Sequence, residues 1–124
     1  MKNIKTPQRI IKIGKQQILS GGAVVIPIIL RGGYGIKHIQ IDIQHDDSDM
    51  SFLRLEKTRQ TQPFEKLSTR KIGNGTIRIS GKSKEGIQTI GEGALLRLYF
   101  QIKTNFSSPR IVSIDEDLSE FTVI

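Results

Sequence analysis

The sequence predicts an all-β fold: a single β-sandwich of about eight or nine strands with jelly-roll-like connections. Apolar residues recur at every second position in several separate segments, and the spacing of an amphipathic helix hardly occurs. Turn-forming clusters of Gly, Asn, Asp and Ser separate these segments. The 124 residues are enough for one core and few for two. We therefore expect one domain over residues 1–124, with residues 1–8 as a flexible leader.

The chain begins with a basic segment, MKNIKTPQRIIKIGK, that is expected to contain the first strand. Its apolar residues alternate with polar ones, and neither a continuous apolar core nor a small-residue cleavage site follows. The segment therefore does not resemble a signal peptide. An extracellular protein would have this sequence as its mature form or as an excised domain.

The segment GGAVVIPIIL, residues 21–30, is predicted to form a buried strand. It is far shorter than the roughly 20 apolar residues that a membrane-spanning helix needs. Most of its apolar residues are β-branched, which is typical of strands. Pro27 has no N–H to donate to a neighbouring strand, so we expect this strand at a sheet edge or at a bulge.

Four later segments alternate apolar and polar residues, as strands with one buried face do: IKHIQIDIQ, FLRLEKT, GTIRISG and ALLRLYFQIK. The segments RIVSI and EFTVI are predicted to be the closing strands, and RQTQPFEKLSTRK, residues 59–71, is predicted to be a loop. The side chains expected in the core are Val24, Ile26, Ile28, Ile39, Ile41, Ile43, Leu53, Leu55, Ile77, Ile79, Ala94, Leu96, Leu98, Phe100 and Ile102.

No arrangement of residues in the sequence favours an enzyme. The chain has no Cys and no G-x-S-x-G motif, and parity places His38 and His45 on opposite faces of one strand. Asp46, Asp47 and Asp49 could form an oxygen-rich calcium turn, but the segment lacks the glycine and the distal glutamate of an EF-hand. We therefore expect a turn with capping side chains, no catalysis, no cofactor and no metal.

The formal net charge of +7 raises the question of an anionic partner. Most of the lysines and arginines are scattered singly, and few aromatic residues accompany them. A solvated basic surface is therefore favoured over a nucleic-acid-binding stripe.

A carbohydrate-binding sandwich is a further alternative. Such modules usually bind sugars on a strip of aromatic side chains, and the chain has no Trp and only two Tyr for such a strip.

The order of the segments resembles that of a cohesin module, the β-sandwich domain of scaffold proteins that binds dockerin modules. The resemblance extends from about Arg9 to Ile114. It is most specific in V-x-I-P-I, beginning at Val24, and in G-A-L-x-x-L-x-F-x-I, beginning at Gly93. The family commonly has a Tyr-Asp-Pro-like turn after the third strand, where this chain has His45-Asp46-Asp47.

The resemblance implies a non-catalytic recognition module that tethers proteins to a scaffold or cell surface. In cohesins the partner usually lies across one sheet, on outward residues of the third, fifth, sixth and last strands. Carried to this sequence, the expected contact residues are His38, Gln40, Asp42, Thr76, Arg78, Ser80, Leu95, Arg97, Tyr99 and Gln101. Leu95 and Tyr99 would be exposed anchors of this face.

The expected partner is a dockerin-bearing protein, with calcium bound on the dockerin. We expect an extracellular or cell-surface location, no nucleic-acid partner, no insertion into a membrane, and a monomer when the domain is isolated. Carbohydrate binding or polyanion binding stays as the alternative.

Overall fold

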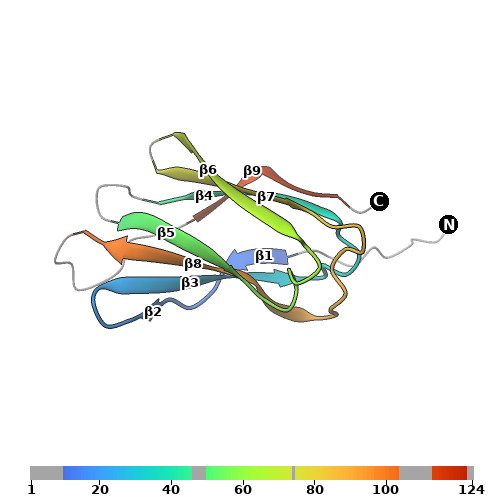
Figure 1. The fold of residues 1–124 in the computed structure, drawn as a ribbon, viewed down its shortest axis with the longest axis horizontal. Helices are drawn as coiled ribbons and strands as arrows, with labels where there is room; N and C mark the ends of the chain where they lie inside the picture. The colour runs from blue at the N-terminus through green and yellow to red at the C-terminus, as the bar shows by residue number, and fades with distance from the viewer. Residues whose placement is uncertain (1–9, 46–49, 74, 104–112, 123–124) are drawn as a thin grey trace.

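The computed structural model describes residues 10–45, 50–73 and 75–103 and the backbone of residues 113–122. Nine strands form two antiparallel sheets within these residues, and no helix occurs among them (Figure 1). This confirms the predicted β-sandwich. The predicted leader 1–8, the acidic turn 46–49, residues 110–112 of RIVSI and residues 123–124 of EFTVI lie outside the described residues.

Sheet A has the strand order β1-β3-β8-β5, and the short strand β2 also pairs with β3. Its strands are β1 (Ile10–Ile13), β2 (Gln17–Ile18), β3 (Ala23–Arg31), β5 (Met50–Lys57) and β8 (Glu92–Ile102). Sheet B has the order β6-β7-β4-β9. Its strands are β4 (His38–Gln44), β6 (Lys66–Gly73), β7 (Thr76–Lys82) and β9 (Ser113–Thr122). The β4·β7 pair is nested in sequence within the β3·β8 pair, as in a jelly roll.

The core lies between the two sheets (Figure 1). The alternation in β3, β4, β7 and β8 predicts its centre correctly, because the residues expected there are at most 2% exposed. These buried residues are Val24, Ile26, Ile28, Ile39, Ile41, Ile43, Ile77, Ile79, Leu96, Leu98 and Phe100. The rings of Phe52 and His45 pack on Phe100, with centroids 5.6 and 5.0 Å away. Sequence alternation does not identify Ile36, Phe64 and Ile87, which are fully buried and come from segments between strands.

β3 is not an edge strand, because it has neighbours on both sides, and the bulge in its pairing with β8 lies just beyond Pro27, between Ile28 and Ile29. The neighbour on one side is interrupted: Ile13 of β1 pairs with Ile28, and Gln17 of β2 pairs with Val25. Pro27 faces this interruption, where its carbonyl accepts a hydrogen bond from Gly14 N at 2.8 Å. Proline is tolerated at this position because neither β1 nor β2 has a residue there that would accept a hydrogen bond from its backbone nitrogen.

The segment 59–71, predicted as a loop, contains most of β6. β6 is an edge strand of sheet B, and most of its side chains are exposed, so it shows no apolar alternation. Leu67 holds it against the core by packing over Gly81 of β7, where a Cβ atom would collide with Leu67 and come within 3.3 Å of Phe64.

Two β-bulges break the predicted alternation in sheet A. One leaves Leu53 without a partner between Phe52 and Arg54, and its side chain is 52% exposed. The other lies at Leu95, because Ile28 pairs with Leu96 while Ile29 pairs with Ala94. An inserted residue shifts the parity of the strand, so Leu53 turns outward and Leu95 turns inward.

None of the described residues belongs to a helix that is long and apolar enough to cross a membrane.

Candidate protein-binding face

Sheet B presents an outer face made of alternate residues of three neighbouring strands, β6, β7 and β4. The isoleucines of β4 and β7 are buried in the core, so the residues between them point away from it. Cross-strand pairing arranges most of the outward residues in three rows, and the predicted contact residue Thr76 lies beyond them, opposite Gln44. The rows are Lys66–Lys82–His38, Ser68–Ser80–Gln40 and Arg70–Arg78–Asp42, and together they are called the sheet B face.

The third row contains a charge pair that fixes part of this face. Arg78 donates hydrogen bonds from Nε to Asp42 Oδ1 at 2.9 Å and from Nη2 to Oδ2 at 3.0 Å. The Asp42 side chain is fully buried, whereas that of Arg78 is 26% exposed. A two-bond fork of this kind holds both groups in one orientation. Asp42, predicted as a contact residue, is therefore positioned to orient Arg78 rather than to touch a partner.

The middle row is made of short polar side chains. Ser68 is exposed, and Ser80 and Gln40 are half-buried. Long side chains flank this row, because Lys66 and Lys82 lie on one side and Arg70 and Arg78 on the other. The face therefore has a shallow polar floor between two basic rows.

The fourth strand of sheet B, β9, lies beside β4 at the edge opposite β6 (Figure 1). Its sequence is SIDEDLSEFT, which carries four acidic residues and no basic one. The sequence of β6, KLSTRKIG, carries three basic residues and no acidic one. Sheet B therefore runs from a basic edge strand to an acidic edge strand.

The structure divides the predicted contact residues between the two sheets. His38, Gln40, Asp42, Thr76, Arg78 and Ser80 lie on β4 and β7 of sheet B. Leu95, Arg97, Tyr99 and Gln101 lie on β8, in the middle of sheet A. The two sheets pack with their inner faces together, so their outer faces look in opposite directions. The prediction that all these residues share one face is therefore wrong.

Leu95 is also wrong as an exposed anchor, because its side chain is fully buried. The bulge turns it into the core, and the pairing of β5 with β8 ends at Leu96, so the backbone carbonyls of Ala94 and Leu95 have no partner on β5. Hydroxyl groups from the segment after β5 satisfy them: Thr58 Oγ1 donates to Ala94 O at 2.6 Å and Thr61 Oγ1 to Leu95 O at 3.0 Å.

Arg97 and Tyr99 belong to a separate cluster on the outer face of sheet A. The Tyr99 hydroxyl donates a hydrogen bond to Glu56 Oε1 at 3.2 Å, and Arg97 Nη1 lies 3.6 Å from the same oxygen. The Arg54 guanidinium lies over the Tyr99 ring, 3.8 Å from its centroid. These contacts stabilise the pairing of β5 with β8 and engage the groups that were expected to bind a partner.

Sequence reasoning missed four residues of the sheet B face. Three of them, Lys66, Ser68 and Arg70, lie on β6, which was predicted as a loop. The fourth is Lys82, at the end of β7. The alternation of Lys66, Ser68 and Arg70 around Leu67 was the available signal, but one apolar residue in a polar segment is a weak indication of a strand.

The sandwich is similar to solved structures of cohesins. CaCohA2 from Clostridium acetobutylicum gives a TM-score of 0.76 at 17% identity over 94% of this chain and 80% of that one. A type I cohesin–dockerin complex with OlpA from Clostridium thermocellum gives 0.70 at 18% identity, over 92% and 91% of the two chains. The sixth cohesin of scaffoldin B from Acetivibrio cellulolyticus, solved with a Cel5 dockerin, gives 0.68 at 21%, over 85% and 79%.

The chain has a cohesin fold. The sequence matches no protein-family model and no curated protein. At these identities the likeness concerns the cohesin fold itself, and the contact residues have to be argued from the surface of this chain.

The histidines of the cohesin-fold domain lie on opposite sides of sheet B, as parity predicts. His45 is buried against Phe100, and His38 lies on the outer face. Within the described ranges no three His, Cys, Asp or Glu side chains are grouped so that they could hold a metal ion. The Asp46–Asp49 segment, which carries the calcium alternative, lies outside those ranges.

Proposed function

We propose that this domain is a non-catalytic recognition module that binds a dockerin-bearing protein through the sheet B face. One observation carries the proposal. When the two-residue strand β2 is set aside, β4, β6, β7 and β9 are the third, fifth, sixth and last strands, and together they form sheet B. These are the strands across which a cohesin partner is expected to lie. Two of the similar structures are complexes of cohesins with dockerins.

The physical character of the face supports recognition of a protein surface. Its strands β4 and β7 are paired on both sides and β6 on one, and the Asp42–Arg78 fork orients one of the long side chains. A preformed face loses little conformational entropy on binding, so more of the contact energy remains as affinity. The short middle row leaves room for side chains of a partner between the two basic rows.

The alternative of a carbohydrate-binding module is not favoured. Among the described side chains Tyr34, which is 58% exposed and lies between β3 and β4, is the only strongly exposed aromatic residue. The ring of Tyr99 is covered by Arg54. The strands β4, β6 and β7 contain no Phe, Tyr or Trp, so the sheet B face offers no aromatic strip to a sugar.

The proposed setting is an extracellular or cell-surface scaffold, in which residues 1–124 are one module. Support comes from the scaffoldin origin of one of the similar cohesins. An assay for this setting is fractionation of the source cells followed by detection of the domain with an antibody.

The experiment that tests the proposed function measures binding to dockerin-bearing proteins encoded by the same genome. We expect at least one of them to bind the wild-type domain. Ser80→Tyr adds bulk to the middle row and should weaken this binding by tenfold or more, which corresponds to about 1.4 kcal/mol. Ser51→Tyr makes the same change on the outer face of sheet A, beside Gln101, and should leave binding unchanged. The proposal fails if no dockerin binds, or if Ser51→Tyr has the larger effect.

A further inference from the structure

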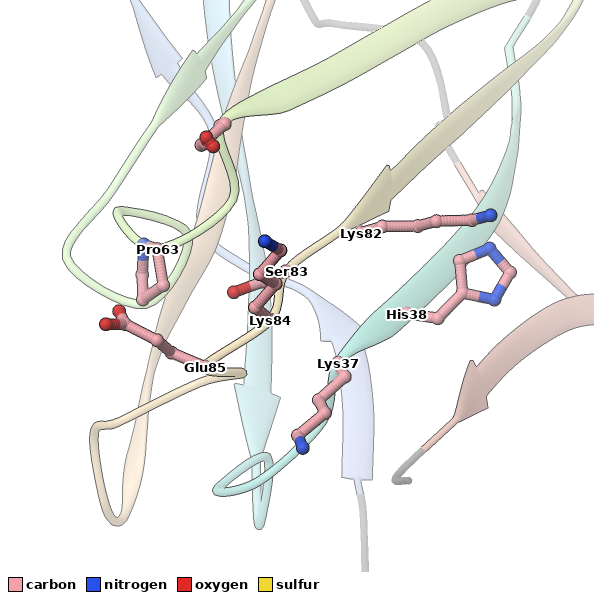
Figure 2. A pocket seen from close by; sticks show the side chains of 8 residues that line it. Lys37, His38, Pro63, Lys82, Ser83, Lys84 and Glu85 are labelled. Atoms are coloured by element: carbon pink, nitrogen blue, oxygen red, sulfur yellow. The ribbon is translucent and has the colours of Figure 1, made fainter.

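A basic recess lies at one end of the sheet B face (Figure 2). It has a volume of about 710 Å³, and Lys37, His38, Lys82 and Lys84 line it together with Glu65 and Glu85. A second hollow of about 420 Å³ shares His38, Glu65 and Lys82 with it. Lys66, Ser68 and Ser80 also line that hollow, so the recess continues into the middle row of the face.

The lysines of this recess form no ion pair with any acidic residue that the structure describes. Within the part of the chain that the structure describes, no carboxylate lies within ion-pair distance of Lys37, Lys66, Lys82 or Lys84. Lys12, on β1, does have such a partner, Glu92, at 3.7 Å. Among the described residues, the recess and the adjoining hollow thus carry four lysines against two glutamates, and none of these lysines forms an ion pair with Glu65 or Glu85.

Strand pairing forces two of these cations together. Lys66 and Lys82 are directly opposite each other on β6 and β7, and Lys82 is directly opposite His38 on β4. His38 and Lys82 extend in the same direction from neighbouring strands (Figure 2). Like charges at opposed positions of an antiparallel pair destabilise the free domain. A bound carboxylate would remove this repulsion, so the arrangement favours an anionic group at this end of the face.

We propose that the recess receives carboxylate side chains of the partner protein, so that the domain selects a partner whose contacting surface is acidic on the β6 side. This inference rests on the proposed function and adds the chemistry of the partner to it. A salt bridge between one of these lysines and a partner carboxylate costs little desolvation, because Lys66, Lys82 and Lys84 are exposed.

The charge distribution of sheet B favours a protein over a nucleic acid as the occupant. A phosphate chain laid across the sheet would run from the basic strand β6 onto β9, whose sequence carries four acidic residues. β4, β6 and β7 also lack the aromatic side chains on which bases stack. A protein surface with acidic residues toward β6 and basic residues toward β9 matches both edges and would dock in one orientation.

The test uses the dockerin that binds the wild-type domain and compares two double variants with equal net charge. Lys66→Gln/Lys82→Gln removes two cations from the recess, and Lys15→Gln/Arg31→Gln removes two from exposed positions outside it. We expect the recess variant to weaken binding by about tenfold, mainly through slower association, and to reduce the salt dependence of the association rate. We expect the matched variant to change binding by about twofold or less.

A charge exchange makes the test specific. If replacing one acidic residue of the dockerin by Lys weakens binding to the wild-type domain, Lys82→Glu should restore part of that loss.

Equal binding by the Lys66→Gln/Lys82→Gln variant and the wild type would overturn the inference and leave the proposed function standing. Absence of any dockerin partner would overturn both. Binding of heparin or a DNA oligonucleotide that is lost in the recess variant, without dockerin binding, would assign the recess to polyanions instead.

Discussion

Arg78 holds the buried carboxylate of Asp42 in a fork of two hydrogen bonds, 2.9 and 3.0 Å long, on the outer face of sheet B. Arg78→Ala should lower the free energy of unfolding by about 3 kcal/mol, because it leaves a buried carboxylate without its guanidinium. Asp42→Asn should cost less, about 2 kcal/mol, since the guanidinium that remains is 26% exposed. Urea denaturation measures both. Losses below about 0.5 kcal/mol in the two variants would contradict this role of the pair.

Phe100→Ala should be among the most destabilising single changes, with a loss of about 3–5 kcal/mol. The Phe100 side chain is fully buried and packs against the rings of Phe52 and His45. Truncation to Ala therefore leaves a cavity that the surrounding core side chains fill only partly. Leu53→Ala is the matched control, because Leu53 is 52% exposed at its bulge and should change stability by less than about 0.5 kcal/mol. Equal losses in the two variants would show that Phe100 is not central to the core.

Removal of divalent metal should leave the melting temperature unchanged. The expectation rests on the absence of a metal-ligating cluster among the residues that the structure describes, and on the incomplete calcium motif of HDDSD. Thermal melts with EDTA and with added calcium measure it. A fall of several degrees in EDTA that calcium reverses would point to Asp46, Asp47 and Asp49, and Asp47→Asn should then reproduce the fall.

The sequence predicts the centre of sheet B because β4 and β7 pair with each other there without a register shift. Ile39, Ile41 and Ile43 of β4 keep strict alternation and are all buried, as are Ile77 and Ile79 of β7. Leu53 and Leu95 break the alternation at bulges. An inserted residue leaves no compositional mark, because whether a strand contains a bulge depends on the pairing of two distant segments.

The contact face was less predictable because one missed strand shifts the count of all later ones. β6 resembles a loop in sequence, since Leu67 is its main anchor on the core. Without β6, β8 takes the place of a sheet B strand in the predicted order, although it lies in sheet A. The outward residues of β4 and β7 were correctly grouped together, whereas those of β8 were not.

Arg97 and Tyr99 of β8, which were predicted to bind the partner, provide control variants for binding to the sheet B face. Tyr99→Ala and Arg97→Ala should change dockerin binding by less than about twofold, because both side chains lie on sheet A, opposite the sheet B face. Tyr99→Ala should still lower the free energy of unfolding by about 1–2 kcal/mol, since it removes the hydrogen bond to Glu56 and the ring under Arg54. Titration calorimetry and urea denaturation on the same preparations separate the two effects. A tenfold loss of binding in either variant, with normal stability, would move the partner to sheet A.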